Sequence, residues 1–255
     1  MTKRVDLNCD LGELPGDAAR ALDRRMMEVV TSVNVACGAH AGDVKTMRAT
    51  VRAARDAGVG VGAHPGFADR EGFGRRELDL PLAEIDALIR GQVEALQEIA
   101  AAEGVAVRHV KAHGALYNMA ARDRTLADAV ACAVAACDPG LAFLGLPGSL
   151  LVDAGRDAGL AVVPEVFADR AYQANGALVP RTQPGAVIHD AEVAVERAVG
   201  MVRDGAVTAI DGTRVALTAG TICVHGDTPG ADAIARQLRD GLEAAGVEVA
   251  PLQAA

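Results

Sequence analysis

Residues 32–66 read SVNVACGAHAGDVKTMRATVRAARDAGVGVGAHPG, and this stretch decides the fold class. It begins with a Val- and Ala-rich run that is typical of a buried strand. It continues as a helix predicted over Val44–Ala57, which stops at Gly58, a residue type that commonly ends helices. A second strand-like run begins directly at Val59. A strand, a helix and a strand in this order predict two parallel strands joined by a right-handed crossover.

The same alternation runs through the whole chain. Other strand-like runs are VDLNCDLGE from Val5, VRHVKAHGALYN from Val107 and TICVHGD from Thr221, with shorter ones at 141–146 and 160–166. Helix-like segments cover 21–30, 82–103, 124–136, 150–158, 192–203 and 231–245. Seven such units predict one α/β domain over residues 1–255, folded as a TIM-like (β/α)7-8 barrel. An open doubly wound sheet is the alternative.

One segment interrupts this alternation. Two short β-prone runs at 207–210 and 213–217 flank Asp211-Gly212. Because Asp-Gly suits a tight primed turn, the pattern predicts a small β-hairpin insert before the last barrel strand.

Composition excludes several classes of function. Hydrophobic residues make up 51% of the 255 residues, but aromatic residues only 2%, with no Trp. Stacking platforms for bases need aromatic rings, and a net charge of -9 disfavours nucleic acid and anionic membranes as partners. No apolar stretch is long enough to span a bilayer, and no signal peptide is evident, so we expect a soluble, cytoplasmic protein.

The five cysteines fit the same compartment. Their number is odd and no CxxC occurs, so we expect free thiols in a reducing cytosol. Cys9, Cys37 and Cys223 are assigned to the apolar faces of their strands and are interpreted as small buried hydrophobic residues.

Titratable residues gather at the ends of the strand-like runs. In the first run, alternation puts Asp6, Asn8 and Asp10 on one strand face and apolar residues on the other. The later runs end in the following residues: His40, His64, Lys111 with His113, and His225 with Asp227. The carboxyl ends of parallel strands converge on one mouth of a barrel, so we expect these side chains to share one site.

Four of these residues are candidates for catalysis: Asp6, Asp10, Lys111 and His113. Carboxyl groups on one strand face push their pKa values apart, which suits acid–base chemistry. An inward-facing lysine is either a site cation or the ion-pair partner of a carboxylate such as Asp10 or Glu165. The alternative for Asp6 and Asp10 is a structural network. The deeper His109 is interpreted as structural.

Two loops carry arginines that suit a carboxylate or phosphate. The loop at 65–80 contains Arg75 and Arg76 among glycines, and the loop at 165–181 contains Asp169, Arg170 and Arg181. We expect Arg75 or Arg76 to clamp the substrate. A solvated surface loop is the alternative for each.

The signals for metal and nucleotide are weak. Asp10, His40 and His64 could hold a divalent metal, but neither HExxH nor His-x-x-x-His spacing occurs. The chain has no GxxxxGK[ST] loop for ATP and no GxSxG elbow of a serine hydrolase.

Eight motifs in collinear order resemble the LamB/YcsF family, the A subunit of prokaryotic ATP-dependent 5-oxoprolinase. They are DLNCDLGE, NVACGAHAGD, GAHPGF, GFGRRE, HVKAHGALYN, EVFADRAY, LVPR and ICVHGDTP, and together they extend over nearly the whole chain. The resemblance implies a barrel related to the polysaccharide-deacetylase-like fold. It also implies ring opening of 5-oxo-L-proline to L-glutamate, with ATP used by a complex with B and C subunits.

The resemblance also transfers site residues from motif to motif. The implied positions are Asp6, Asn8, Asp10, Glu13, His40, His64, Lys111, His113, Glu165, Asp169, Arg170, His225 and Asp227. Two other functions stay open at this point. One is a stand-alone metal-dependent amidohydrolase or deacetylase, and the other is a non-catalytic subunit that only binds the lactam.

Overall fold

The computed structural model describes residues 3–224 and 230–252. Strands β1 (Lys3–Leu11), β2 (Ser32–Ala36), β3 (Gly60–His64), β4 (Val107–Lys111), β5 (Ala142–Gly145), β6 (Ala161–Phe167) and β9 (Thr221–Val224) pair in this order, all parallel. Pairing of β9 with β1, through Asp6 opposite Thr221, closes the sheet into a barrel. The predicted barrel is confirmed, and the open sheet is excluded.

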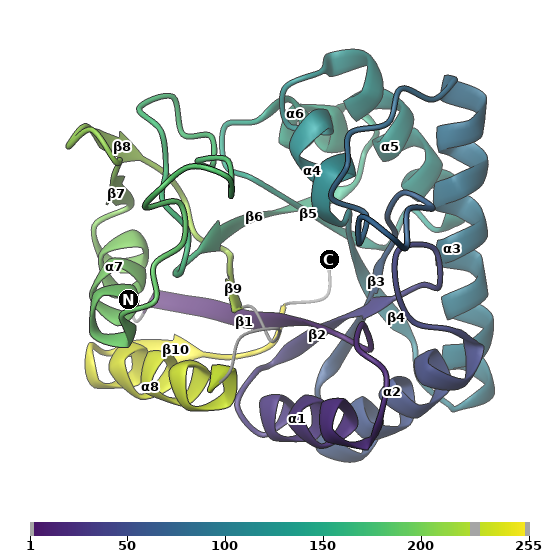
Figure 1. Ribbon diagram of the computed structural model, residues 1–255, viewed down its shortest axis with the longest axis horizontal. Coiled ribbons are helices and arrows are strands. Elements are labelled where there is room, and N and C mark those ends of the chain that lie inside the picture. The colour runs from purple at the N-terminus through teal and green to yellow at the C-terminus, as the bar shows by residue number, and fades with distance from the viewer. Residues whose placement is uncertain (1–2, 225–229, 253–255) are drawn as a thin grey trace.

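Helices surround the barrel (Figure 1). They are α1 (Asp17–Met27), α2 (Val44–Ala57), α3 (Leu82–Ala102), α5 (Arg124–Cys137), α6 (Leu150–Asp157), α7 (Ala191–Arg203) and α8 (Ala231–Ala244). Successive helices pack side by side, as α1 does on α2 and α2 on α3. The odd-numbered apolar residues of β1, such as Leu7 and Cys9, are fully buried in the core beneath these helices. No helix in the described ranges is long and apolar enough to cross a membrane.

The β-hairpin insert is present, with a different turn. β7 (Ala206–Thr208) and β8 (Arg214–Ala216) pair antiparallel, with Thr208 opposite Arg214. The amide of Gly212 donates to the carbonyl of Ala209, and Gly212 has φ 87°. The connection therefore has three residues between Ala209 and Thr213, and ends on a left-handed glycine, where the Asp-Gly pair predicted a two-residue turn.

Two short elements were not predicted. α4 (Gly114–Ala120) begins directly after β4, inside a run that the sequence pattern treats as one strand. β10 (Val247–Val249) pairs with the first residues of β1.

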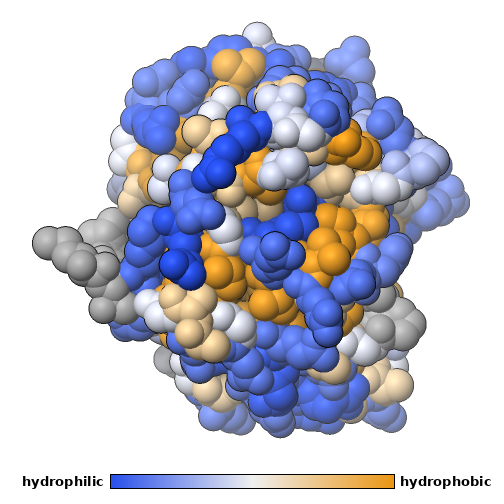
Figure 2. Space-filling model, turned by 90° about the vertical axis from the view of Figure 1, so that its left-hand side faces the viewer, coloured by the Kyte–Doolittle hydropathy of each residue, from blue (hydrophilic) through white to orange (hydrophobic). Residues whose placement is uncertain are grey.

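The hairpin and α7 lie on the side of the molecule that Figure 2 presents, where apolar residues are grouped among hydrophilic ones.

Candidate active site

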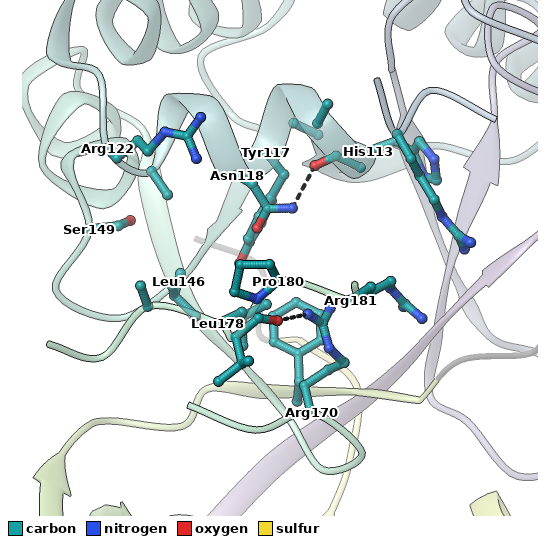
Figure 3. A pocket seen from close by; sticks show the side chains of 18 of the residues that line it. His113, Tyr117, Asn118, Arg122, Leu146, Ser149, Arg170, Leu178, Pro180 and Arg181 are labelled. Atoms are coloured by element: carbon teal, nitrogen blue, oxygen red, sulfur yellow. Dashed lines mark hydrogen bonds between the residues drawn. The ribbon is translucent and has the colours of Figure 1, made fainter. Parts of the chain in front are cut away.

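A cavity of about 800 Å³ opens at the carboxyl ends of the barrel strands. Its inner wall includes Asp10, Glu13, His64, Lys111 and His113. Its outer wall comes from α4 and from the loops at 146–149 and 173–182. Figure 3 shows Tyr117 and Asn118 of α4 on one side of this space, opposite Arg170, Pro180 and Arg181. The predicted convergence of strand ends therefore produces a hollow with titratable groups at its base.

Four residues lie at the rim of the barrel, which is the base of the cavity, each at or just after the end of a strand. We call them the rim cluster: Glu13, His40, His64 and His113. One ligand atom from each lies within 4.8 Å of the other three. Glu13 Oε1 is 3.3 Å from His40 Nε2 and 3.5 Å from His113 Nδ1. The three histidines are buried, so their charge states depend strongly on these neighbours.

His64 and His113 face each other through ring nitrogens. Nδ1 of His64 lies 2.7 Å from the carbonyl of Lys111, and Nε2 of His113 lies 2.8 Å from the carbonyl of Phe73. A carbonyl only accepts, so both of these nitrogens must carry their protons. The remaining nitrogens, Nε2 of His64 and Nδ1 of His113, are 2.9 Å apart. When both rings are neutral, these two nitrogens are acceptors that face each other with no hydrogen between them.

The surroundings pull the pKa values of these two rings apart. Burial lowers the pKa of His64, but the adjacent Asp10 carboxylate raises it, and the net pKa lies above the ordinary value. Burial, together with His64 and His40, holds the pKa of His113 far below the ordinary value. Asp10 Oδ2 contacts His64 Nε2 at 3.3 Å, so His64 stands between Asp10 and His113.

Lys111 occupies the middle of the barrel. Its ammonium lies 2.9 Å from Glu165 Oε1 and 3.0 Å from Asp10 Oδ1, and it donates to Cys223 Sγ at 3.0 Å. Burial alone would lower the pKa of Lys111, but Asp10, Cys223 and Glu165 raise it well above the ordinary value. Lys111 is therefore a fixed cation that lines the cavity and forms ion pairs with both carboxylates.

Cys223 corrects an expectation from the sequence. Thr221 and Cys223 alternate with Ile222 and Val224, and their contacts with Asp6 and Lys111 place them inside the barrel. Cys223 therefore faces the polar interior and not the apolar layer, although it is buried as predicted.

Deeper in the barrel lies the floor network, formed by Asp6, Asn8, Asn34, His109 and Thr221. Asp6 accepts hydrogen bonds from the hydroxyls of Thr31, Ser32 and Thr221. Burial raises the pKa of Asp6, and these hydroxyls partly offset the effect. None of these five residues is among those that line the cavity.

Amide side chains connect the floor network to the site. Asn8 donates to Thr221 and Glu165, and Asn34 donates to Asn8 and Asp10, each of the last two at 2.7 Å. His109 Nε2 donates to Asn34 Oδ1 at 2.8 Å, and burial lowers the His109 pKa to about 3, so the ring is neutral. A Cβ on Gly62 would lie 2.1 Å from the His109 ring, which explains the glycine there.

The two loop arginines have different surroundings. Arg75 lines the cavity, and its guanidinium lies 5.0 Å from the centre of the Phe73 ring. Arg76 does not line the cavity and forms an ion pair with Asp69 in its own loop. This pairing, chiefly the Arg76 hydrogen bond, lowers the pKa of Asp69 to about 2. Of the two, Arg75 is therefore the one positioned to meet a ligand in the cavity.

Of the three residues singled out in the second loop, two line the cavity and one lies outside it. Arg170 is buried, donates to the carbonyls of Val179 and Ala186, and has its pKa lowered to about 10 by burial and by Arg181. Arg181 lines the cavity, whereas Asp169 does not. His225 and Asp227 lie outside the described residues.

Several residues at or near the cavity were not predicted. Asn34 shares strand parity with His40 and could have been found from alternation. Phe73, Tyr117 and Asn118 depend on loop and helix placement that a strand pattern does not contain, whereas Phe167 is the last residue of β6. Tyr117 is buried at 3% exposure and lines the cavity.

Comparison with known proteins identifies the family. The model of the LamB/YcsF family matches residues 5–255. The chain belongs to this family. It is 56% identical, over 96% of its length and 97% of the relative's, to a protein from Chloroflexus aggregans that is named as the A subunit of 5-oxoprolinase.

Solved structures agree with the fold. The lactam utilization protein from Thermus thermophilus superposes with a TM-score of 0.89 at 47% identity, covering 97% of this chain and 99% of that one. A T48 deacetylase superposes with a TM-score of 0.51 at 18% identity, covering 98% and 89%. At this low identity, the second match shows similarity of fold only.

Proposed function

We propose that this chain is the A subunit of a 5-oxoprolinase. In an assembly with B and C subunits that uses ATP, it would hydrolyse the ring amide of 5-oxo-L-proline to give L-glutamate. The observation that carries the proposal is the meeting of Asp10, Lys111 and His113 at one cavity, in a chain 56% identical to a 5-oxoprolinase component.

Hydrolysis of a lactam needs three things from a site: a base for water, a cation for the developing oxyanion and a proton for the departing nitrogen. Asp10 is the proposed base. Lys111 and Asn34 donate hydrogen bonds to its Oδ1, while its Oδ2 contacts His64 at the cavity. His113 is less suited, because one of its nitrogens is held by Phe73 and the other faces His64.

Lys111 is the proposed electrostatic partner of the oxyanion. It lines the cavity at 3% exposure, and Asp10, Cys223 and Glu165 keep it charged. Charge in such a desolvated place acts more strongly than in water.

Arg75 and Arg181 are the proposed partners of the substrate carboxylate. Both line the same cavity as Lys111, and guanidinium groups bind carboxylates with two parallel hydrogen bonds. Arg76 is a less favoured candidate, because Asp69 already engages it.

ATP has no proposed site in this chain, because the sequence contains no P-loop. Hydrolysis of a five-membered lactam is not strongly downhill, so coupling to ATP in a partner subunit accounts for the family's assembly. We expect the isolated chain to show no lactam-stimulated ATPase activity.

The test is conversion of 5-oxo-L-proline to glutamate by the purified chain, with and without B and C subunits and ATP. We expect glutamate only when all components are present, and formation about 10²–10³-fold slower when Lys111→Met replaces the native chain. Turnover by the isolated chain without ATP would instead establish a stand-alone amidohydrolase. Undiminished turnover with Lys111→Met would favour a chain that only binds the lactam.

A further inference from the structure

The two facing nitrogens of His64 and His113 present an unusual electrostatic arrangement. Each ring is fixed by a backbone carbonyl, of Lys111 and Phe73 respectively, so neither can turn its N–H toward the other. Two lone pairs 2.9 Å apart in a buried place repel unless a cation lies between them. That cation is either one shared proton or a metal ion.

The spacing of the rim cluster fits a metal ion. Donors about 2.0–2.2 Å from one tetrahedral ion lie about 3.3–3.6 Å apart. Glu13 Oε1 is 3.5 Å from His113 Nδ1 and 3.9 Å from His64 Nε2, and the two nitrogens are 2.9 Å apart. Shifts of a few tenths of an ångström would bring all three donors to one ion.

Ring orientation separates His40 from the other two histidines. A nitrogen lone pair lies in the plane of its ring. His40 and His113 are stacked, with planes only 2° apart and centres 3.8 Å apart, so no single ion can lie in both planes. The planes of His64 and His113 are 88° apart and intersect. His40 therefore acts through Glu13, to which its Nε2 can donate at 3.3 Å.

We propose that Glu13, His64 and His113 bind one Zn²⁺-like divalent ion at the base of the cavity. Two neutral imidazoles and a carboxylate form a common three-ligand set with an open fourth position. The carbonyls of Lys111 and Phe73 then serve as the outer partners that orient ligating histidines. When bound, such an ion supplies Lewis acidity toward an oxygen ligand.

Two glycines support the arrangement. A Cβ on Gly74 would lie 2.8 Å from both His113 and His40, and one on Gly66 would lie 2.8 Å from His40 and 3.1 Å from His113. The backbone therefore approaches the stacked rings closely from two sides, and fixes the tilt on which the choice of ligands depends.

The test is calorimetric titration of the full chain with Zn²⁺ after treatment with a chelator. We expect one ion per chain, a raised unfolding midpoint, and the strong visible absorption of a tetrahedral site when Co²⁺ replaces Zn²⁺. These readouts need no turnover. Catalytic use of the ion rests on the proposed function, but the binding measurement does not, so the two can fail separately.

The variants separate ligands from neighbours. His64→Gln, His113→Gln and Glu13→Gln should each weaken binding more than about 100-fold, because even outer-shell changes cost about 10–100-fold. His40→Asn should keep one ion per chain. The matched control is His189→Gln, since His189 is exposed, and it should bind as the native chain does.

The unfolding midpoint of each metal-free variant shows that it is folded. Absence of saturable Zn²⁺ binding by the folded native chain would overturn the proposal in favour of the shared proton. Equal loss in His64→Gln and His189→Gln would overturn it as well.

Discussion

The floor network and the rim cluster use the same kinds of residue in opposite ways. In the floor network most donors meet acceptors: three hydroxyls surround Asp6, and His109 Nε2 donates to Asn34, although the buried His109 Nδ1 has no hydrogen-bond partner. In the rim cluster acceptors meet acceptors, as at the facing nitrogens of His64 and His113. Satisfied buried networks rigidify a fold, whereas unsatisfied groups are characteristic of sites. We therefore expect changes in the floor network to affect mainly stability, and changes in the rim cluster to affect mainly activity.

Lys111 is linked to the floor network through Asp10 and Glu165, which accept hydrogen bonds from Asn34 and Asn8, and its loss should have the largest effect. Lys111→Met leaves the buried Glu165 and the partly buried Asp10 without their shared cation. We expect the free energy of unfolding to fall by about 3–5 kcal/mol and kcat to fall about 10²–10³-fold. Chemical denaturation and lactam turnover in the full assembly measure the two effects.

A second variant separates these effects. Adding Glu165→Gln to Lys111→Met removes the uncompensated negative charge of Glu165. Part of the stability should therefore return, while activity stays low. Recovery of turnover in the double variant would contradict the role of Lys111 as the site cation.

Asp6→Ala tests the floor network directly. Three buried hydroxyls lose their common acceptor, and each unsatisfied group costs about 1–3 kcal/mol, less whatever rearrangement recovers. We expect unfolding to become easier by about 2–4 kcal/mol, with kcat per folded molecule changed less than about threefold. A stable Asp6→Ala protein with lost turnover would move Asp6 into the mechanism.

Gly62→Ala tests whether His109 holds its place by close packing. The added methyl would overlap the His109 ring, and overpacking of this kind costs about 1–3 kcal/mol. Gly91→Ala is the matched control, because it adds the same methyl to helix α3 with nothing within 4 Å. The control should instead stabilise by about 0.5–1 kcal/mol. Similar unfolding midpoints for both variants would show that the floor is loosely packed.

Arg75→Ala should have the smallest effect, confined to substrate binding. Loss of one charged hydrogen-bond partner of the carboxylate should raise KM about 10–100-fold with little change in kcat. Arg76→Ala is the control from the same loop and should leave KM nearly unchanged, because Arg76 forms an ion pair with Asp69. The reverse ranking would show that the loop rearranges when substrate binds.

Strand periodicity predicted most of the fold and the inner part of the site. Alternation put Asp6, Asn8 and Asp10 on one face, and convergence of strand ends brought His40, His64 and His113 together. The prediction was weaker beyond the last residue of each strand. Nothing in the local pattern distinguished Arg75 from Arg76, or separated α4 from β4, because these depend on contacts between distant segments.

The most direct test compares two histidines four residues apart. His109 belongs to the floor network, and His113 to the rim cluster. His109→Gln and His113→Gln make the same chemical change. Their unfolding midpoints are measured on the metal-free chains, and kcat per folded molecule is measured in the assembled enzyme. We predict that His109→Gln lowers the midpoint of the metal-free chain and keeps kcat, while His113→Gln keeps that midpoint and lowers kcat about 10–100-fold, as expected for a disturbed metal centre. Equal loss of kcat in both variants, or normal kcat in His113→Gln, would contradict the division between floor and rim.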